Sequence, residues 1–336
     1  MKIGHIDLTK SVLLVAEIGN NHEGNFDRAV ELIRAARKAG AGAVKFQTIV
    51  PDRLVSPKEK DRIRQLEKFR LSYDQFEKLS RVAKEEGVLF LSTPFDLESV
   101  KFLEPLVPAF KIASGDNNFF PLIEAIARTK KPIILSSGLT DLRQIKRTKE
   151  FIDGFWKEQG TRQELAILHC VVSYPTAPGE ANLLAIRDLQ KLNVTIGYSD
   201  HTLGIEAAVL SVAVGARIIE KHFTLDKNYS DFHDHKISAD PAEFAALAQR
   251  VRQTVELLGD GVKRIQESEK KILDKVRRSI VTRHELAKGA VIQAEDLNWV
   301  RPLAGLEPGQ EEKVVGKTLK RPLGAGEPIL LKDLEG

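Results

Sequence analysis

Two short stretches place a histidine directly after a run of apolar residues. YSDHTLG (198–204) contains His201, and EKHFTLD (220–226) contains His222. Histidines that end neighbouring strands can converge, and two neutral imidazoles can hold a divalent metal that keeps open positions for water and substrate. Two protein ligands favour a labile Mn²⁺ or Mg²⁺ site over a closed zinc site. A hydrogen-bonded structural pair is the alternative.

Two lysines lie inside apolar runs, where a buried ammonium group needs an anionic partner. Lys45 belongs to AVKFQT (43–48) and Lys111 to AFKIAS (109–114). Gln47 shares the face of Lys45, because alternate residues of a strand point the same way. Two lysines with nearby hydroxyl groups predict a site for a phosphate or a carboxylate. A lone lysine that reaches solvent is the alternative for each.

These residues fall within a regular alternation of short apolar runs and helical segments. The runs are continuous, as is typical of strands buried on both faces, and they span residues 12–19, 43–48, 89–94, 109–114, 132–138, 165–170, 194–200 and 217–224. Eight strand–helix units in about 250 residues predict a (β/α)₈ TIM barrel of the α/β class. An open doubly wound sheet is the alternative, but EIGNNHEGN (17–25) is not its Gly-rich phosphate loop.

Catalytic groups of such a barrel come from the carboxyl ends of its strands. The polar residues at those ends are Glu17, Lys45, Gln47, Thr93, Lys111, Ser114, Asp116, Ser136, Tyr174, Ser199, His201, Glu220 and His222. Asp234 follows the eighth run and is a further candidate acid or base. We interpret Cys170 as a buried, small, apolar residue.

Capping residues and composition divide the chain. Asn25 is placed to cap a helix over 26–39. Asp240 is placed to cap a second helix, with Pro241 in its first turn and Glu243 as the capping-box partner. We predict that residues 1–258 form the barrel, that the charged stretch 259–278 is a helical linker, and that 279–336 is a small β-rich domain. Within that domain LAKGAVIQAEDL and LGAGEPILLKDL are similar. They suggest two hairpin-like units.

Charge and cysteine content narrow the choice of partners. Lys and Arg number 51 against 47 Asp and Glu, a net charge of +4 without a basic tail. This distribution argues against nucleic acid or a membrane surface as a partner.

Cys170 is the single cysteine, which suits a reducing compartment. No apolar run approaches the roughly 20 residues of a membrane span, and the first residues lack a secretory signal, so we expect a cytoplasmic protein.

The motifs AEIGNNHEGN, AVKFQT, KIASGDNN, PIILSSG, YSDHTLG, EKHFTLD and DHKIS occur in this order. Together they resemble the sialic acid synthase family, and the tail resembles the antifreeze-like (SAF) domain of those enzymes. The resemblance implies condensation of phosphoenolpyruvate with an N-acylated hexosamine such as N-acetylmannosamine. It also implies a divalent metal, typically Mn²⁺ with Mg²⁺ or Co²⁺ as alternatives. A domain-swapped homodimer is implied as well, with the SAF domain covering the partner's site.

The resemblance also assigns residues. By position, His201 and His222 match metal ligands. The residues that match the phosphoenolpyruvate site are Lys45, Lys111, Ser114, Ser136 and Ser199, with Gln47 and Thr93 beside it. The residues that match positions around the sugar and the reacting centre are Glu17, Tyr174, Glu220 and Asp234. Arg301 matches a SAF arginine that reaches the site of the neighbouring subunit. Glu17, Asp116, Glu220 and Asp234 are the candidates for proton transfer.

The chain departs from the N-acetylneuraminate synthase pattern near the sugar. Asp116 replaces a glutamate, Val172 replaces an asparagine, and DFHDH (231–235) replaces a PGPDH loop. Legionaminic or pseudaminic acid synthase, or a related surface-polysaccharide enzyme, therefore remains an alternative. Outside the family, the alternatives are a Schiff-base aldolase that uses Lys111 or Lys45 and a sugar-binding protein without catalysis.

Overall fold

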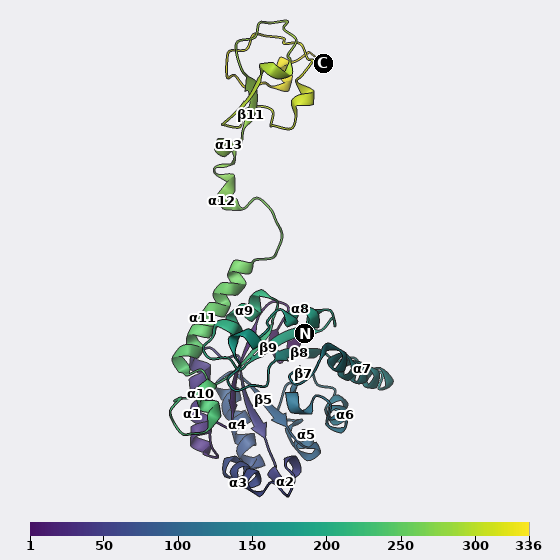
Figure 1. Cartoon of the computed structure of the whole chain (residues 1–336), viewed down its shortest axis with the longest axis vertical. Coiled ribbons are helices and arrows are strands. Elements are labelled where there is room, and N and C mark those ends of the chain that lie inside the picture. Colours follow the sequence, from purple (N-terminus) through teal and green to yellow (C-terminus); the bar gives the residue numbers. More distant parts are fainter. Residues whose placement is uncertain (336) are drawn as a thin grey trace. The chain divides into compact units, whose positions relative to one another are not determined.

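The computed structural model describes residues 1–335 of the 336-residue chain. The chain divides into two compact units, Met1–Gly259 and the segment that begins at Asp260 (Figure 1). Among the described residues, no helix combines the length and the apolar character needed to cross a bilayer.

Eight parallel strands form the centre of the first unit. They are β3 (Leu13–Gly19), β4 (Ala43–Thr48), β5 (Leu89–Pro94), β6 (Phe110–Ile112), β7 (Ile133–Ser136), β8 (Leu165–Cys170), β9 (Thr195–Asp200) and β10 (Ile218–His222). Their order is β5-β4-β3-β10-β9-β8-β7-β6, and β5 and β6 contact each other to close the barrel. The predicted (β/α)₈ barrel is confirmed.

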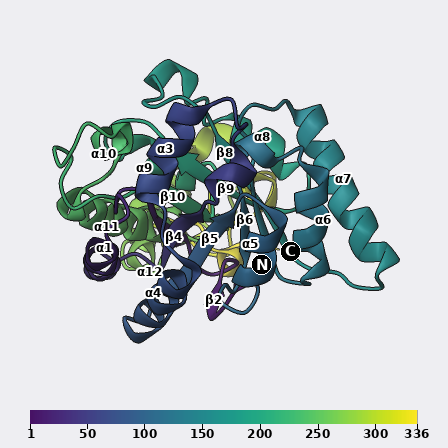
Figure 2. The same ribbon diagram turned by 90° about the horizontal axis from the view of Figure 1, so that it is seen from below.

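Helices surround the strands (Figure 2). They are α1 (Phe26–Lys38), α4 (Tyr73–Glu85), α5 (Leu97–Leu103), α6 (Phe120–Arg128), α7 (Leu142–Glu158), α8 (Ala185–Gln190), α9 (Glu206–Ala213) and α11 (Pro241–Leu258), with the shorter α2 (Pro51–Leu54), α3 (Lys60–Phe69) and α10 (His233–Ile237) in loops. The predicted caps are present: Asn25 accepts from the Arg28 N–H, and Asp240 forms a capping box with Glu243.

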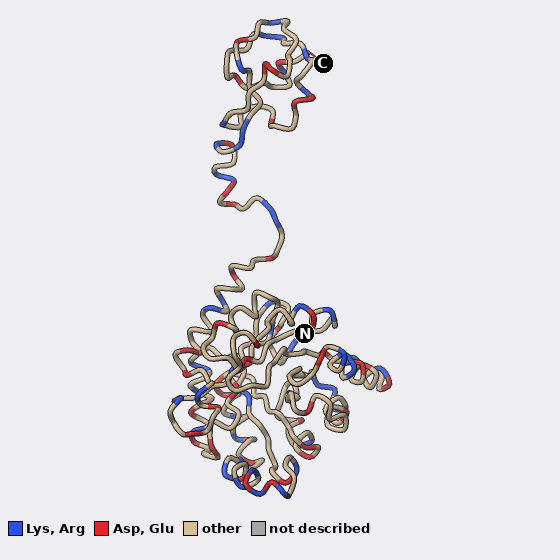
Figure 3. The backbone as a smooth tube through the Cα atoms, viewed as in Figure 1, with Lys and Arg blue, Asp and Glu red and all other residues tan. Residues whose placement is uncertain are grey.

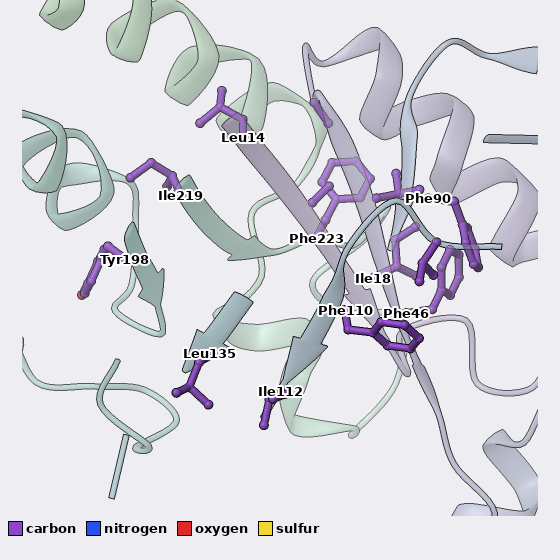
Figure 4. Packing of buried hydrophobic residues seen from close by; sticks show 14 of the residues in the cluster. Leu14, Ile18, Phe46, Phe90, Phe110, Ile112, Leu135, Tyr198, Ile219 and Phe223 are labelled. Carbon is purple, nitrogen blue, oxygen red and sulfur yellow. The ribbon is translucent and has the colours of Figure 1, made fainter. Parts of the chain in front are cut away.

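The outward faces of the strands pack against the helices and carry the main core. Figure 4 shows part of it, including Phe46, Phe90, Phe110 and Tyr198. The Phe46 ring lies 5.7 Å from that of Phe90 and 6.3 Å from that of Phe76 on α4. Each buried aromatic side chain removes a large apolar area from water and stabilises the fold accordingly.

The inward faces near the amino ends of the strands form a second apolar cluster. Its members include Val15, Leu91 and Ile218, all about 1% exposed or less, and a hairpin of β1 (Lys2–Ile3) and β2 (Ile6–Asp7) adds Ile3 and Leu8. Two-residue strands have no periodic signal, so this hairpin was not predicted. The cluster and hairpin close the barrel at that end.

The second unit begins with a sparsely structured segment. The prediction of a helical linker over 259–278 was largely wrong, because only α12 (Glu267–Lys270) and α13 (Leu273–Val276) are helical there. Every residue of both helices is at least partly exposed. Isolated short helices are marginal without a packed face. Lys and Arg are interspersed with Asp and Glu along this segment and over the chain, as Figure 3 shows.

The remainder of the second unit is β-rich. β11 (Ser279–Thr282) pairs antiparallel with β12 (Leu297–Val300), around a core that includes Ile280, Ile292 and Ile329. The two similar halves detected in the sequence are related in space: the backbones of Leu286 and Leu323, the first residue of each half, exchange two hydrogen bonds of 2.9 Å.

Candidate active site

The carboxyl ends of the strands enclose a polar cavity of about 230 Å³. Most of the predicted site residues line it: Glu17, Lys45, Gln47, Thr93, Lys111, Ser114, Ser136, Tyr174, Ser199, His201, Glu220 and His222. Because side chains alternate along a strand, the same strands send Phe46, Ile112 and Tyr198 outward to the core. The barrel thereby concentrates polar groups from seven strands, and from the segments that follow β6, β8 and β9, in one cavity.

Lys45 lies at the centre of one half of the cavity. Its Nζ is 2.6 Å from Oε2 of Glu17 and 3.3 Å from the hydroxyl of Thr93. Gln47 donates to the other oxygen of Glu17 at 2.9 Å. Burial lowers the pKa of Lys45, but the Glu17 and Glu220 carboxylates outweigh burial and raise it. Lys45 is therefore a fixed positive charge.

Lys111 lies at the centre of the other half. Its Nζ donates to Ser136 Oγ at 2.7 Å, while Oε1 of Glu220 is 3.7 Å away, longer than a hydrogen bond. Glu220 Oε1 accepts from Ser199 at 3.1 Å. Burial lowers the pKa of Lys111 and the charge of Lys45 lowers it further. An anion that approaches Lys111 would therefore stabilise its charged form.

The pKa values of the two carboxyl groups in the cavity, Glu17 and Glu220, are shifted in opposite directions. Burial raises the pKa of Glu17, and the attraction of Lys45 does not cancel that effect. Burial would also raise the pKa of Glu220, but Lys111 and Lys45 outweigh burial and lower it. Neighbouring carboxyl groups with separated pKa values are typical of acid–base pairs in active sites.

The imidazoles of His201 and His222 lie side by side, with ring centroids 5.5 Å apart. Nδ1 of His201 is 2.7 Å from the carbonyl oxygen of Val171. A carbonyl accepts only, so Nδ1 carries the proton and Nε2 keeps a free lone pair. Nδ1 of His222 is buried without a hydrogen-bond partner, and burial lowers the pKa of His222 to about 4.

These two imidazoles fit a divalent metal as a pair. His222 is neutral at physiological pH and has an unpaired buried nitrogen. Burial lowers the pKa of His201, but Cys170 and the Val171 carbonyl outweigh burial and raise it; a metal at His201 would therefore compete with a proton. No group of three or more metal-binding side chains occurs among residues 1–335, so small molecules would complete the coordination.

Asp116 and Asp234 belong to the first unit but not to the wall of the cavity. Asp116 ends the short 3-10 turn Ser114–Asp116, and burial raises its pKa. Asp234 lies on α10, with Oδ2 3.9 Å from Nδ1 of His222 and Oδ1 2.9 Å from Nε2 of His233. Arg301 follows β12 and belongs to the second compact unit.

The cavity also contains residues that the sequence did not identify as site residues. Phe95, Ala113, Gly115 and Cys170 line it, together with Val172, which the sequence placed near the sugar only as a departure from the family pattern. Most are apolar or lack a side chain, so a search for ionisable strand ends passes over them. Cys170 is buried as expected, yet its Sγ lies 3.8 Å from Nδ1 of His201. Tyr174 is less covered: its ring packs 4.2 Å from that of His201, and 42% of the residue is exposed.

Comparison with known proteins agrees with this geometry. Residues 32–263 match the NeuB family and residues 277–335 match the SAF domain. The N,N'-diacetyllegionaminic acid synthase of Campylobacter jejuni is 38% identical over 92% of this chain and 96% of its own length. The pseudaminic acid synthase of the same species is 35% identical over the full length of both chains.

A solved structure gives the same result. The crystal structure of the N-acetylneuraminic acid (sialic acid) synthetase of Leptospira borgpetersenii superposes with a TM-score of 0.75 at 34% identity, covering 81% of this chain and 94% of that one. The predicted resemblance is therefore confirmed over both the barrel and the tail. The chain belongs to the NeuB family of synthases, the sialic acid synthase family, and carries a C-terminal SAF domain.

Proposed function

We propose that the protein condenses phosphoenolpyruvate with an N-acylated hexosamine to give a nine-carbon 2-keto sugar acid and phosphate. Membership of the NeuB family supports this reaction. One observation carries the proposal: two buried lysines and two adjacent imidazoles line the same cavity. Such a cavity can receive an anion and a carbonyl compound together, which is what a bimolecular condensation requires.

Phosphoenolpyruvate is proposed to lie against Lys45 and Lys111, with the hydroxyl groups of Ser114, Ser136 and Ser199 around it. Its C3 forms a bond to the aldehyde carbon of the open-chain sugar, water adds to C2, and the C–O bond to phosphate breaks. The sum is phosphoenolpyruvate plus sugar plus water, giving the 2-keto acid plus inorganic phosphate. Fixed ammonium groups stabilise the charge of the phosphate and carboxylate without reorganisation.

The carboxyl groups divide the proton transfers in this proposal. Glu17, whose pKa burial raises, is the candidate general acid for the aldehyde oxygen, where negative charge develops. Glu220, with its lowered pKa, stays ionised and can stabilise positive character at C2. Asp116 and Asp234, on the loops, are further candidates to accept the proton of the added water.

The metal is proposed to bind at His201 and His222. When bound there, Mn²⁺, or Mg²⁺ or Co²⁺ in its place, polarises the aldehyde oxygen as a Lewis acid. Tyr174 packs on the His201 ring and limits the approach of solvent to that side.

The acceptor has two candidates, N-acetylmannosamine and a 2,4-diacetamido-trideoxyhexose. Val172 favours the second, because it lines the cavity and offers no hydrogen bond to a sugar hydroxyl. The similar synthases from Campylobacter jejuni are named for legionaminic and pseudaminic acids, which also supports the second candidate.

Assembly and location complete the proposal. We propose a cytoplasmic homodimer in which the SAF domain of one subunit covers the cavity of the other, with Arg301 reaching the acceptor. The exposure of Tyr174 leaves room for such a cover. A dimer that forms in solution, with activity lost when Arg301 is replaced by alanine, would support this arrangement.

The first experiment measures phosphate release from phosphoenolpyruvate with each candidate sugar. The protein is treated with EDTA and assayed before and after Mn²⁺ is restored, and mass spectrometry identifies the product. Release that depends on Mn²⁺ and is lost in His201→Ala supports the proposal. No release with either sugar, together with borohydride trapping of pyruvate on a lysine, would replace it with a Schiff-base aldolase. Sugar binding without either reaction would leave a non-catalytic binding protein.

A further inference from the structure

An ion pair lies behind the two histidines, on the side of the strands that faces the helices. Nζ of Lys221 is 2.8 Å from Oδ2 of Asp200, and both side chains are 1% exposed or less. Asp200 ends β9 and precedes His201, and Lys221 precedes His222 at the end of β10. Asp200 and Lys221 are register partners in the parallel ladder. Each charged residue is thus the immediate neighbour of one histidine and points to the opposite face.

The same pair fixes the chain just beyond His201. Oδ1 of Asp200 accepts from the Thr202 N–H at 2.9 Å and from the Thr202 hydroxyl at 2.8 Å. Nζ of Lys221 donates to the Thr202 carbonyl at 2.5 Å. The backbone on both sides of His201 is therefore tied to β10. Nδ1 of His201 donates to the Val171 carbonyl at 2.7 Å and lies 3.8 Å from Sγ of Cys170, and these contacts set its ring orientation.

Stability alone does not explain a charged pair at this place. Two ions buried between strands and helices lose their hydration, and apolar residues of similar size often stabilise a protein as well or better. The ion pair instead contributes specificity. Its directional hydrogen bonds favour one register of β9 and β10 and one conformation of the turn after His201. We propose that Asp200 and Lys221 are positioning residues that set the spacing of His201 and His222 for a divalent cation. This inference rests on the metal site of the proposed function.

The test is a titration of EDTA-treated full-length protein with Mn²⁺, in which electron paramagnetic resonance measures free Mn²⁺. Asp200→Asn should bind Mn²⁺ on the order of tenfold more weakly, the effect typical of residues that orient metal ligands. The double variant Asp200→Asn with Lys221→Met buries no unpaired charge. It should regain much of the thermal midpoint that the single variant loses, yet bind Mn²⁺ as weakly.

The control is Ile152→Ala, a fully buried position on α7 outside the cavity wall. It should lower the thermal midpoint and leave the Mn²⁺ affinity unchanged. At saturating Mn²⁺, the KM for phosphoenolpyruvate of the double variant should match that of the wild type, because the lysine half of the cavity is intact.

The outcomes separate this inference from the function on which it rests. If the folded double variant binds Mn²⁺ like the wild type, the positioning role is wrong while the metal site stands. If the wild type itself binds no Mn²⁺, the metal site of the proposed function is wrong and the inference falls with it. If Ile152→Ala weakens Mn²⁺ binding as much as the double variant does, the effect is one of general stability and the positioning role is rejected.

Discussion

Lys45 on β4 and Glu17 on β3 face each other across neighbouring strands, with 2.6 Å between Nζ and Oε2. Lys45 is 3% exposed and Glu17 is 2% exposed. Their strands are joined by a parallel ladder in which the two residues are register partners. The pair holds a positive charge and a carboxyl group of raised pKa next to each other.

Glu17→Gln should lower kcat by roughly 10²–10⁴-fold, the usual contribution of a general acid or base. Glutamine keeps the shape and can still hydrogen-bond to Gln47, but it cannot deliver a proton. The KM for phosphoenolpyruvate should change little, since Lys45 and Lys111 remain. Steady-state kinetics with both substrates varied checks this split. A kcat within threefold of the wild type would remove Glu17 from the proton transfers.

Lys111→Met should weaken phosphoenolpyruvate binding more than any single serine replacement. Lys111 hydrogen-bonds to Ser136 but not to Glu220, so its charge is available to a ligand. Isothermal titration with phosphoenolpyruvate gives the affinity directly. The matched control is Ser136→Ala, which leaves the ammonium group in place and should have a smaller effect. Equal effects of the two variants would contradict a direct role for the charge.

Val172→Asn should change the choice of acceptor. An amide at this point of the cavity wall can hydrogen-bond to a sugar hydroxyl, and such a contact is worth about 1–3 kcal/mol in discrimination. We expect kcat/KM to rise for N-acetylmannosamine relative to the diacetamido-trideoxyhexose. Competition between the two sugars in one reaction, followed by mass spectrometry, measures the ratio. An unchanged ratio would show that Val172 does not contact the part of the sugar that differs.

Phe46→Ala should destabilise the barrel by about 3–5 kcal/mol, because it removes a fully buried ring and leaves a cavity. Urea unfolding followed by circular dichroism measures the free energy of unfolding. Phe46 points away from the cavity, so the activity per folded molecule should be retained at a temperature well below the transition. Activity lost in the folded state would mean that the outer packing shapes the site.

Asp333 gives the second unit an acid-sensitive ion pair. Arg321 hydrogen-bonds to both its oxygens, at 2.7 and 3.1 Å, and lowers the pKa of Asp333. The lowered pKa stabilises the folded state above the unfolded-state pKa of about 3.9. This contribution should decline as the pH falls below about 4 toward the folded-state pKa.

Tryptophan fluorescence can follow that transition. Trp156 and Trp299 are the two tryptophans of the chain, one in each unit, so Trp156→Phe leaves Trp299 as the reporter of the second. In this background Asp333→Asn should lower stability at pH 7 and flatten its dependence on pH below 4. An unchanged acid dependence would show that Asp333 does not control the transition.

The strands of the barrel were predictable because they are continuous apolar runs, most of which carry a polar residue at or just beyond their carboxyl end. Lys45 and Lys111 identified the cavity for the same reason, since a lysine within such a run has to meet an anion. The role of Asp200 was harder to predict. The sequence places Ser199, Asp200 and His201 together, but the alternation of side chains directs Asp200 to the opposite face.

Other features left no signal in the sequence. Phe95 and Ala113 look like ordinary apolar residues, and only the closed barrel brings them to the cavity. The β1–β2 hairpin is too short for periodicity to reveal. The segment 259–278 has the composition of a helix, yet few of its residues are helical, since helix propensity without a packed face is insufficient.

Because the apolar cluster and the β1–β2 hairpin close the amino end of the barrel, the cavity opens at the carboxyl ends of the strands. Whatever enters must pass the rim at Tyr174, and whatever forms must leave by the same opening. The lysines are each 3% exposed, whereas Tyr174 at the rim is 42% exposed. A ligand bound at the lysines therefore lies beneath one bound at the rim. We expect phosphoenolpyruvate to enter before the sugar, and phosphate to be the last product released.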